Sequence, residues 1–239
     1  MKYSKGYKSY LIEGVIVFLS VLFSFYITGL NNIKKDKISK NISLKDLSNT
    51  MIIDTLQIRE ILKNKELSIT NLELIIRDID NKHIYLTDDA FFETYIQIDV
   101  GQTFMPRKGI FNQLISTGGL ELIKSKELKN NLIEIFNHLK ERNESISRII
   151  DELVFIKYLP LIDSKFRTKR KQLEKESEIT YGRTIITDAV FNESFYYSNE
   201  FYEILNSSLG FSVAYKNLMQ SMLQEYKKSI NLIRVELSS

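Results

Sequence analysis

The chain of 239 residues contains no cysteine and no tryptophan, and it has only two prolines and nine glycines. The absence of cysteine excludes a disulfide framework, a thiolate metal site and a thiol nucleophile. Because proline and glycine interrupt helices, their scarcity favours long helices over many short strands. Isoleucine and leucine supply most of the apolar residues and recur at helical spacing, so we expect an all-α protein.

Charge of either sign is not in marked excess. The chain is 44% hydrophobic and 26% charged, which is typical of a globular protein, and wholesale disorder is not expected. The formal net charge of +3 is small for this length. It argues neither for nor against a polyanionic partner.

Histidine, a common catalytic and metal-binding residue, is also scarce. The two histidines, His83 and His138, are far apart in the sequence and form no paired motif. A structural role is therefore expected for both. The sequence has no glycine-rich phosphate loop, nucleophile elbow or paired-histidine zinc motif. We expect neither an enzyme nor a cofactor or metal site.

One long hydrophobic run is present near the N-terminus. Residues 14–33 contain no acidic or basic side chain, and 20 helical residues extend about 30 Å, the thickness of a bilayer's hydrocarbon core. Tyrosines precede the run and lysines bracket it, as at membrane interfaces. A cleaved signal peptide is the alternative, but Phe25 and Tyr26 occupy the place where small cleavage residues belong. We predict a basic tail at 1–9 and a transmembrane helix at 10–33.

The orientation of this span depends on lysines near its two ends. Three lysines lie before it and five follow within residues 34–45, which slightly favours a cytoplasmic C-terminal domain.

Glu13, at the edge of the run, has two interpretations. It is either a functional intramembrane carboxylate or a group at the headgroup boundary. The second is favoured, because the uncharged residues that follow are long enough to span a membrane alone.

An amphipathic stripe follows the span. Apolar residues recur every three or four positions from Leu44 to Ile79, which predicts a long helix over about 43–80 that packs within the chain or across a dimer. Lys65 interrupts the stripe, and a kink or break is expected there. A connection follows, with a short extended piece at His83 to Leu86.

The central block contains several helix-boundary signals. Pro106 suits the first turn of a short helix at about 107–117, and Gly118 and Gly119 supply the positive φ that ends it. Ser125 is the expected cap of a long helix at about 126–158, with Glu127 in its first turn. This helix should end before Pro160.

A basic segment follows, and it is predicted to be a loop at about 163–183. Five cations there form a basic patch that either binds anionic headgroups or nucleic acid, or is solvated surface: Lys165, Arg167, Lys169, Arg170 and Lys171. Solvated surface is favoured, and nucleic acid is not expected, because a single aromatic residue, Phe166, lies among the cations.

The last part of the chain is predicted to form helices at about 188–237. Ser198 is a plausible cap. The aromatic cluster between Phe195 and Tyr202 either lines a ligand pocket or packs as core, and core packing is favoured.

The anchor and the central block together resemble a family of uncharacterised bacterial membrane proteins. The resemblance rests on Glu13 opening the span, Asn31–Asn32 closing it, the Phe104–Pro106 element, and the segment from Ser116 to Leu128. The tryptophan that often follows the asparagines is missing. The resemblance implies a single N-terminal span followed by a helical domain outside the cytoplasm, and it implies no activity.

These patterns together predict a single-pass protein of the bacterial inner membrane carrying an elongated antiparallel helical bundle. The resemblance outweighs the slight excess of lysines after the span, so we expect the bundle on the extracytoplasmic side. We expect it to act as a scaffold or accessory subunit through contacts with its own copies or with another membrane protein. Two alternatives are an extracytoplasmic sensor that binds a small ligand, and a subunit of an ion-coupled or defence complex that uses Glu13.

Overall fold

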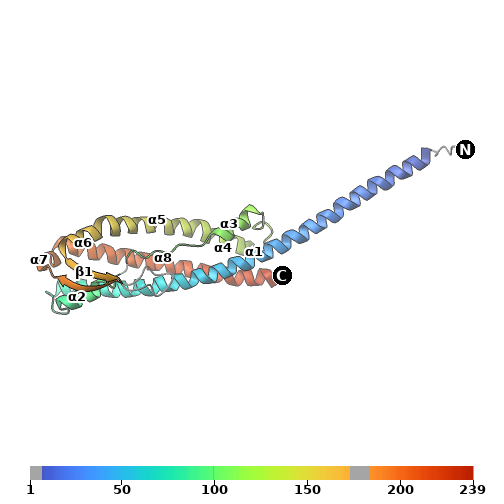
Figure 1. Ribbon diagram of the computed structural model, residues 1–239. Helices are drawn as coiled ribbons and strands as arrows, with labels where there is room; N and C mark the ends of the chain where they lie inside the picture. The colour runs from blue at the N-terminus through green and yellow to red at the C-terminus, as the bar shows by residue number, and fades with distance from the viewer. Residues whose placement is uncertain (1–6, 99, 173–183, 239) are drawn as a thin grey trace.

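The computed structural model describes residues 7–98, 100–172 and 184–238, and it is predominantly helical, as the composition predicted. Three long helical stretches lie side by side, and one of them projects far beyond the others (Figure 1). The elements are α1 (Tyr7–Asp80), α2 (Asp88–Tyr95), α3 (Gly109–Ser116), α4 (Lys126–Ile133), the π-helical η1 (Glu134–Leu139), α5 (Lys140–Asp151), the π-helical η2 (Glu152–Tyr158), α6 (Leu159–Lys165), β1 (Arg167–Gln172), β2 (Thr184–Val190), α7 (Glu193–Tyr196) and α8 (Asn199–Ser238).

Helix α1 is a single helix of 74 residues, about 110 Å long at 1.5 Å per residue. The prediction of separate helices at 10–33 and 43–80 is wrong, because the residues between them contain no glycine or proline and favour helix. The expected break at Lys65 is also absent. The Lys65 side chain is buried in the stripe, where Nζ donates to the Val100 carbonyl at 2.7 Å and lies 5.6 Å from the centre of the Tyr215 ring.

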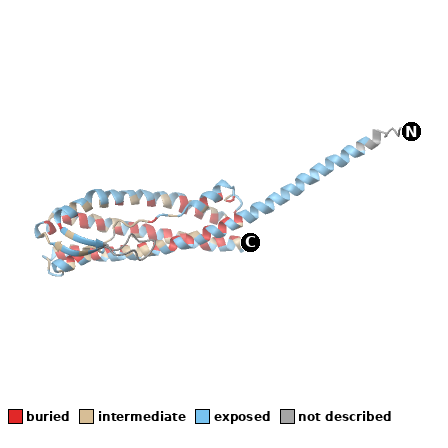
Figure 2. Ribbon diagram, in the orientation of Figure 1, coloured by how far each residue is buried: buried red, intermediate tan, exposed pale blue. Residues whose placement is uncertain are grey.

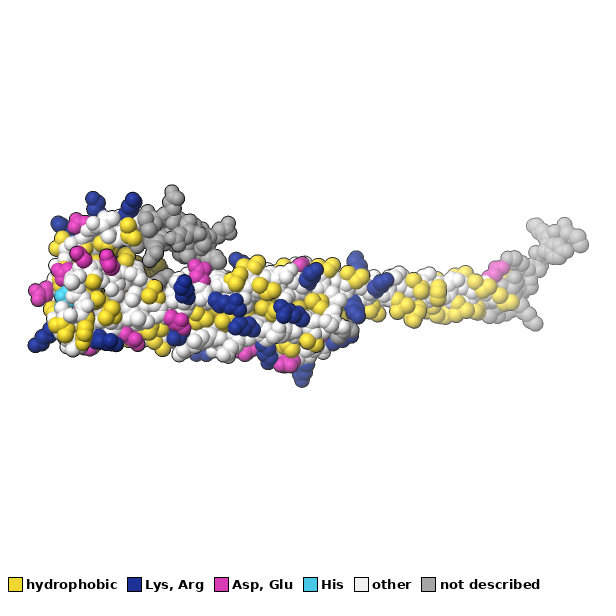
Figure 3. Space-filling model, turned by 90° about the horizontal axis from the view of Figure 1, so that it is seen from below, with side chains coloured by type: hydrophobic (Ala, Val, Ile, Leu, Met, Phe, Trp, Pro, Cys, Tyr) yellow, Lys and Arg dark blue, Asp and Glu magenta, His cyan; other side chains and the backbone are white. Residues whose placement is uncertain are grey.

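The N-terminal part of α1 has no packing partner in the described chain. Every residue from Ile12 to Ser39 is exposed, and burial begins at Lys40 (Figure 2). Hydrophobic side chains cover this projecting part, and Lys and Arg side chains appear where it meets the domain (Figure 3). By length and composition α1 is the one described helix able to cross a membrane.

Helices α1 and α8 pack antiparallel along their common length. Lys40 contacts Glu236 near one end of the pair, and Asp80 contacts Tyr202 near the other. The predicted inward stripe of α1 is confirmed by the burial of Leu44, Met51 and Leu72. The larger core cluster joins this stripe to side chains of α4 and α8, including Leu128, Leu132, Met219 and Met222.

The third helical stretch runs without interruption from Lys126 to Lys165. The prediction that it ends before Pro160 is wrong. In η2 the Leu159 amide bonds to the Val154 carbonyl five residues back, so the turn is wider than an α-turn. Pro160 then lies in the first turn of α6 and has no amide hydrogen to donate, and the wider turn of η2 accommodates it within the continuous stretch.

The boundary signals of the central block are partly confirmed. Ser125 caps α4 by accepting from the Leu128 amide at 3.1 Å, and Glu127 lies in the first turn of α4. Pro106 lies before α3 rather than in its first turn, because α3 begins only at Gly109. Gly118 has the predicted positive φ of 70°. Gly119 does not; a Cβ there would lie 2.8 Å from Leu114 Cδ1 and 3.3 Å from the Leu114 carbonyl oxygen, so a side chain at this position would require Leu114 to shift.

The basic segment forms a strand rather than a loop. Strand β1 pairs antiparallel with β2, with Arg167 opposite Val190 and an irregularity between Lys169 and Arg170. Residues 173–183 of the predicted loop lie outside the described residues. The C-terminal prediction is corrected in the same region, because residues 188–190 belong to β2 and α8 is one helix.

The aromatic cluster packs as core, as favoured from the sequence. Phe195, Tyr196 and Phe201 are buried in a second core cluster, together with Leu72 and Ile75 of α1. This cluster closes the end of the domain opposite the projecting part of α1, which we call the tip.

Candidate functional site

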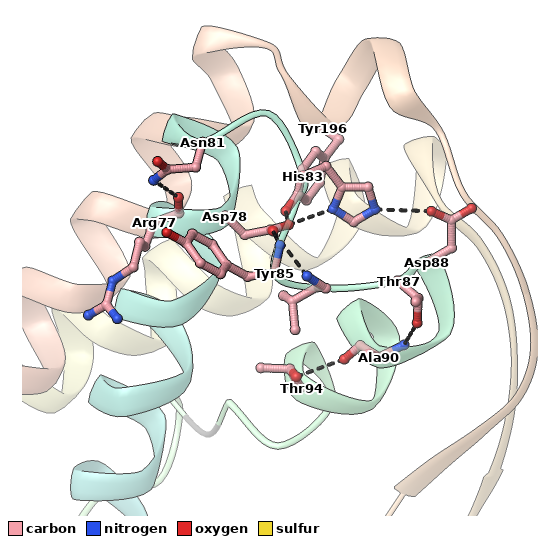
Figure 4. A network of polar contacts seen from close by, with 11 residues as sticks. Arg77, Asp78, Asn81, His83, Tyr85, Thr87, Asp88, Ala90, Thr94 and Tyr196 are labelled. Atoms are coloured by element: carbon pink, nitrogen blue, oxygen red, sulfur yellow. Dashed lines mark hydrogen bonds and ion pairs between the residues drawn. The ribbon is translucent and has the colours of Figure 1, made fainter.

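The most connected polar group of the tip is the carboxylate of Asp78, in the last turn of α1 (Figure 4). Its side chain is fully buried. Oδ1 accepts from the backbone amides of Tyr85 at 2.7 Å and Leu86 at 3.1 Å. Oδ2 accepts from the Tyr196 hydroxyl at 2.5 Å and contacts His83 Nδ1 at 2.5 Å. A single buried carboxylate therefore joins α1, the following turn and α7.

The turn after α1 brings His83 back toward Asp78. Lys82 and His83 both have left-handed backbone conformations, with φ of 61° and 60°, which are uncommon for residues other than glycine. The chain therefore turns at His83, the first residue of the expected extended piece, and residues 84–86 form no strand.

The imidazole of His83 lies between two carboxylates. Nδ1 contacts Asp78, and Nε2 lies 3.1 Å from Asp88 Oδ1. The ring stacks on Phe191 of the segment after β2, with centroids 5.1 Å apart and planes 6° apart. We call Asp78, His83, Asp88 and Tyr196 the tip cluster.

The electrostatics of the tip cluster follow from burial and hydrogen bonding. Burial alone raises the pKa of Asp78, but the hydrogen bonds from Tyr196, His83 and the backbone amides outweigh it, and the pKa is lowered. Burial alone lowers the pKa of His83, but contacts with the two carboxylates outweigh it, and the pKa is raised. Burial and the contact with Asp78 raise the pKa of Tyr196. The arrangement favours imidazolium between carboxylates.

The contacts of the tip cluster are structural, because they join its members to one another. Both ring nitrogens of His83 are engaged by carboxylates, and Tyr196 donates to Asp78, so each group already has a partner. Among the described residues no group of three or more His, Asp or Glu side chains is arranged to hold a metal ion. No local pattern predicts the tip cluster, because the spacing of five residues between Asp78, His83 and Asp88 is not that of a helix face.

Stability should depend on pH through His83. A raised pKa in the folded state means that the stabilisation is complete below the ordinary pKa of histidine and is lost as pH rises through the raised value. As pH rises from about 6 to about 9, we expect the full chain to lose more unfolding free energy than a His83→Asn variant. Asparagine is chosen because it tolerates left-handed backbone.

Thermal unfolding in mild detergent at several pH values measures this difference. His138→Asn is the matched control and should follow the wild-type profile. If the stabilities of wild type and His83→Asn changed in parallel with pH, protonation of His83 would make no contribution to the free energy of unfolding.

A second buried polar group lies at the other end of the α1–α8 pair. Lys40 Nζ is 2.7 Å from Glu236 Oε1, and the two side chains are 3% and 2% exposed. The Glu236 carboxylate also accepts from the backbone amides of Lys124 and Ser125, each at 3.0 Å. We call this group the proximal clasp. It ties the end of α8 to α1 and to the residues that begin α4.

The clasp keeps its carboxylate ionised. Burial raises the pKa of Glu236, but the hydrogen bonds from Lys40 and from the two amides outweigh it, so the pKa is lowered. Ser125, identified from the sequence only as a cap, therefore also contributes its amide to the clasp. Glu127 forms an exposed ion pair with Lys228 at 3.0 Å.

The residues predicted from the sequence to be functional belong neither to the tip cluster nor to the proximal clasp. Glu13 is exposed on the projecting part of α1. The basic patch is at the tip, where β1 follows α6 (Figure 1). Lys165 Nζ lies 5.9 Å from the centre of the Phe195 ring, and Arg170 pairs with Asp163. Arg167, Lys169 and Lys171 are exposed.

The position of the basic patch limits what it can contact. The neighbouring tip core contains Leu72 of α1, which lies about 55 Å along the helix from Lys34 at 1.5 Å per residue. A continuous α1 therefore places the patch far along the helix from the apolar segment, so contact with the headgroups of a membrane crossed by that segment would require the domain to tilt toward the bilayer.

Comparisons of the chain with models of protein families, with curated proteins and with solved structures found no match.

Proposed function

We propose that the protein is a single-span membrane protein whose domain works through protein–protein contacts, as a scaffold or accessory subunit. The observation that supports the membrane part most is the exposure of every residue from Ile12 to Ser39 on a helix that is apolar over residues 14–33. In water such a surface is unfavourable at about 25 cal/mol per Å², whereas in lipid it carries no such cost.

The continuity of α1 supports the scaffold role. No loop or glycine separates the apolar segment from the part of α1 that packs on α8. A domain on such a rod stands at a fixed height from the membrane and cannot swing freely. The tip cluster and the proximal clasp strengthen the two ends of the α1–α8 pair, which suits a part that positions partners rather than one that reshapes around a substrate.

The sensor and ion-coupled alternatives have less support. The aromatic cluster that would line a ligand pocket is core at Phe195, Tyr196 and Phe201. The side of the membrane on which the domain lies remains a prediction, and so does the family resemblance.

Extraction of the full chain from its native membranes in mild detergent tests the proposed contacts. We expect at least one protein, another membrane protein or a second copy of the chain, to stay bound in near-stoichiometric amount. Mass measurement of the purified particle and identification of its components give the answer. A chain that leaves the membrane fraction as an isolated monomer contradicts the proposal.

A further inference from the structure

The part of α1 that packs on α8 carries a second stripe on its outer side. Its members follow one another at spacings of three or four residues, so they share one face of the helix. They are Ile38, Ile42, Lys45, Asn49, Ile53, Leu56, Glu60, Lys63 and Leu67. We call this set the outer stripe.

The apolar members of the outer stripe have no partner in the described chain. Ile42 is 58% exposed, Leu56 is 53% exposed and Leu67 is 45% exposed, and Ile38 and Ile53 are similar. The core residues Leu47, Met51 and Ile58 lie on the opposite side of the same helix. The outer stripe therefore adds nothing to the fold as described, although it repeats large aliphatic residues over about 45 Å.

The outer stripe continues into the apolar segment. Ser20, Ser24, Thr28, Asn31 and Lys35 precede Ile38 at the same spacing of three or four, so they lie on the same face of α1. The small side chains of Ser20, Ser24 and Thr28 let two helices approach closely in lipid. One face of one helix thus offers contacts suited to lipid at one end and contacts suited to water at the other.

We propose that this face pairs with the same face of a second copy of the chain, in parallel and about a two-fold axis. The inference takes the membrane anchoring from the proposed function. Copies anchored at the same end are parallel, so each level of α1 meets the same level of its partner. A second α1 matches the small residues in lipid and the aliphatic residues in water, all in one register.

The charges around the outer stripe are complementary under this symmetry. Lys45 lies toward one edge of the stripe and Asp46 lies beyond the other edge, at nearly the same height. A two-fold axis along the stripe therefore places Lys45 of each copy beside Asp46 of the other. Lys63 and Glu60 are related in the same way. Within the described part of the chain none of these four residues forms an ion pair.

The polar residue within the stripe also suits self-pairing. Asn49 lies between Ile42 and Leu56 on the stripe and is exposed. In a two-fold pair the two Asn49 amides face each other, and such a polar pair between apolar layers fixes the register of parallel helices. A different occupant would have to supply an amide at that height.

Disulfide cross-linking in native membranes tests the inference, because the chain has no cysteine of its own. Ile42→Cys and Leu56→Cys are placed on the stripe. Ser221→Cys is the matched control, since Ser221 is exposed on α8 at about the height of Leu56 but off the stripe. A disulfide requires Cα atoms within about 7 Å, so it reports direct apposition.

We expect both stripe variants to form a reducible covalent dimer, in an amount about tenfold above Ser221→Cys. Cross-linking no greater than the control, or linkage to a different polypeptide, would overturn the inference. Retention of another protein in detergent without self-linkage would overturn it while leaving the proposed function in place. An isolated monomer in detergent would overturn both.

A charge exchange separates specific pairing from chance collision. In the Leu56→Cys background, Lys45→Glu should lower the covalent dimer about threefold, because it places two acidic residues together at each pair. Adding Asp46→Lys should restore the dimer. A dimer yield insensitive to the single reversal, or one not recovered by the exchange, would contradict the two-fold arrangement.

Discussion

Replacing Asp78 by asparagine is expected to lower the free energy of unfolding by about 3 kcal/mol. The Asp78 carboxylate receives the amides of Tyr85 and Leu86 and the hydroxyl of Tyr196, and it contacts His83. Asparagine keeps one acceptor oxygen and replaces the other by an NH₂ donor. Buried donors around it would then lose their acceptor, and the charge that favours imidazolium at His83 would be lost.

Thermal unfolding of the full chain in mild detergent measures this effect, which corresponds to a fall in Tm of about 8 °C for a domain of this size. Asp80→Asn is the matched control. Asp80 is two residues away, is exposed, and contacts the Tyr202 hydroxyl at 3.1 Å. Its replacement should lower Tm by about 2 °C or less. Equal effects of the two substitutions would contradict the role given to the tip cluster.

Replacing Glu236 by glutamine is also expected to lower the free energy of unfolding, by about 3 kcal/mol. The substitution leaves the charged Lys40 side chain, which is only 3% exposed, without its counter-ion. The amides of Lys124 and Ser125 also exchange a charged acceptor for a neutral one. The end of α8 should then separate from α1, and proteolysis should begin in the last turns of α8.

Glu127→Gln provides the comparison for Glu236→Gln. Glu127 also pairs with a lysine, at 3.0 Å, but its side chain is 60% exposed, and such pairs contribute about 1 kcal/mol or less. Lys40→Met combined with Glu236→Gln should be about 1 kcal/mol less destabilising than the sum of the two single changes, because the uncompensated buried charge is gone. Additivity of the two changes would show that the ion pair is not coupled.

Much of the fold could be predicted because helical periodicity is local. The inward stripe of α1, the cap at Ser125 and the positive φ of Gly118 are each set by residues within a few positions. Strand β1 was missed because "RTKRKQ" has no apolar alternation that predicts a strand. Strand β2 did carry a signal, the β-branched run from Thr184 to Thr187, which favours strand over the helix expected nearby.

The proximal clasp and the tip cluster, at the two ends of the α1–α8 pair, could not be predicted from local periodicity. Lys40 and Glu236 are 196 residues apart, and Asp78 and Tyr196 are 118 apart, so no local pattern relates them. His83 reaches Asp78 only because Lys82 and His83 adopt left-handed backbone, which lysine and histidine do not predict. Lys65 appeared as an interruption because a buried lysine is rare.

Labelling of single cysteines can determine whether residues 14–33 of α1 lie in lipid, as proposed, while the part of the helix that follows lies in water. Leu22→Cys and Phe25→Cys lie away from the outer stripe, so self-pairing does not shield them; Lys37→Cys and Ser221→Cys mark the aqueous part. In membranes opened to reagent on both sides, a charged maleimide should label the last two quickly and the first two only after denaturation. Labelling of Leu22→Cys and Phe25→Cys as fast as Ser221→Cys in undisrupted bilayers would contradict the account.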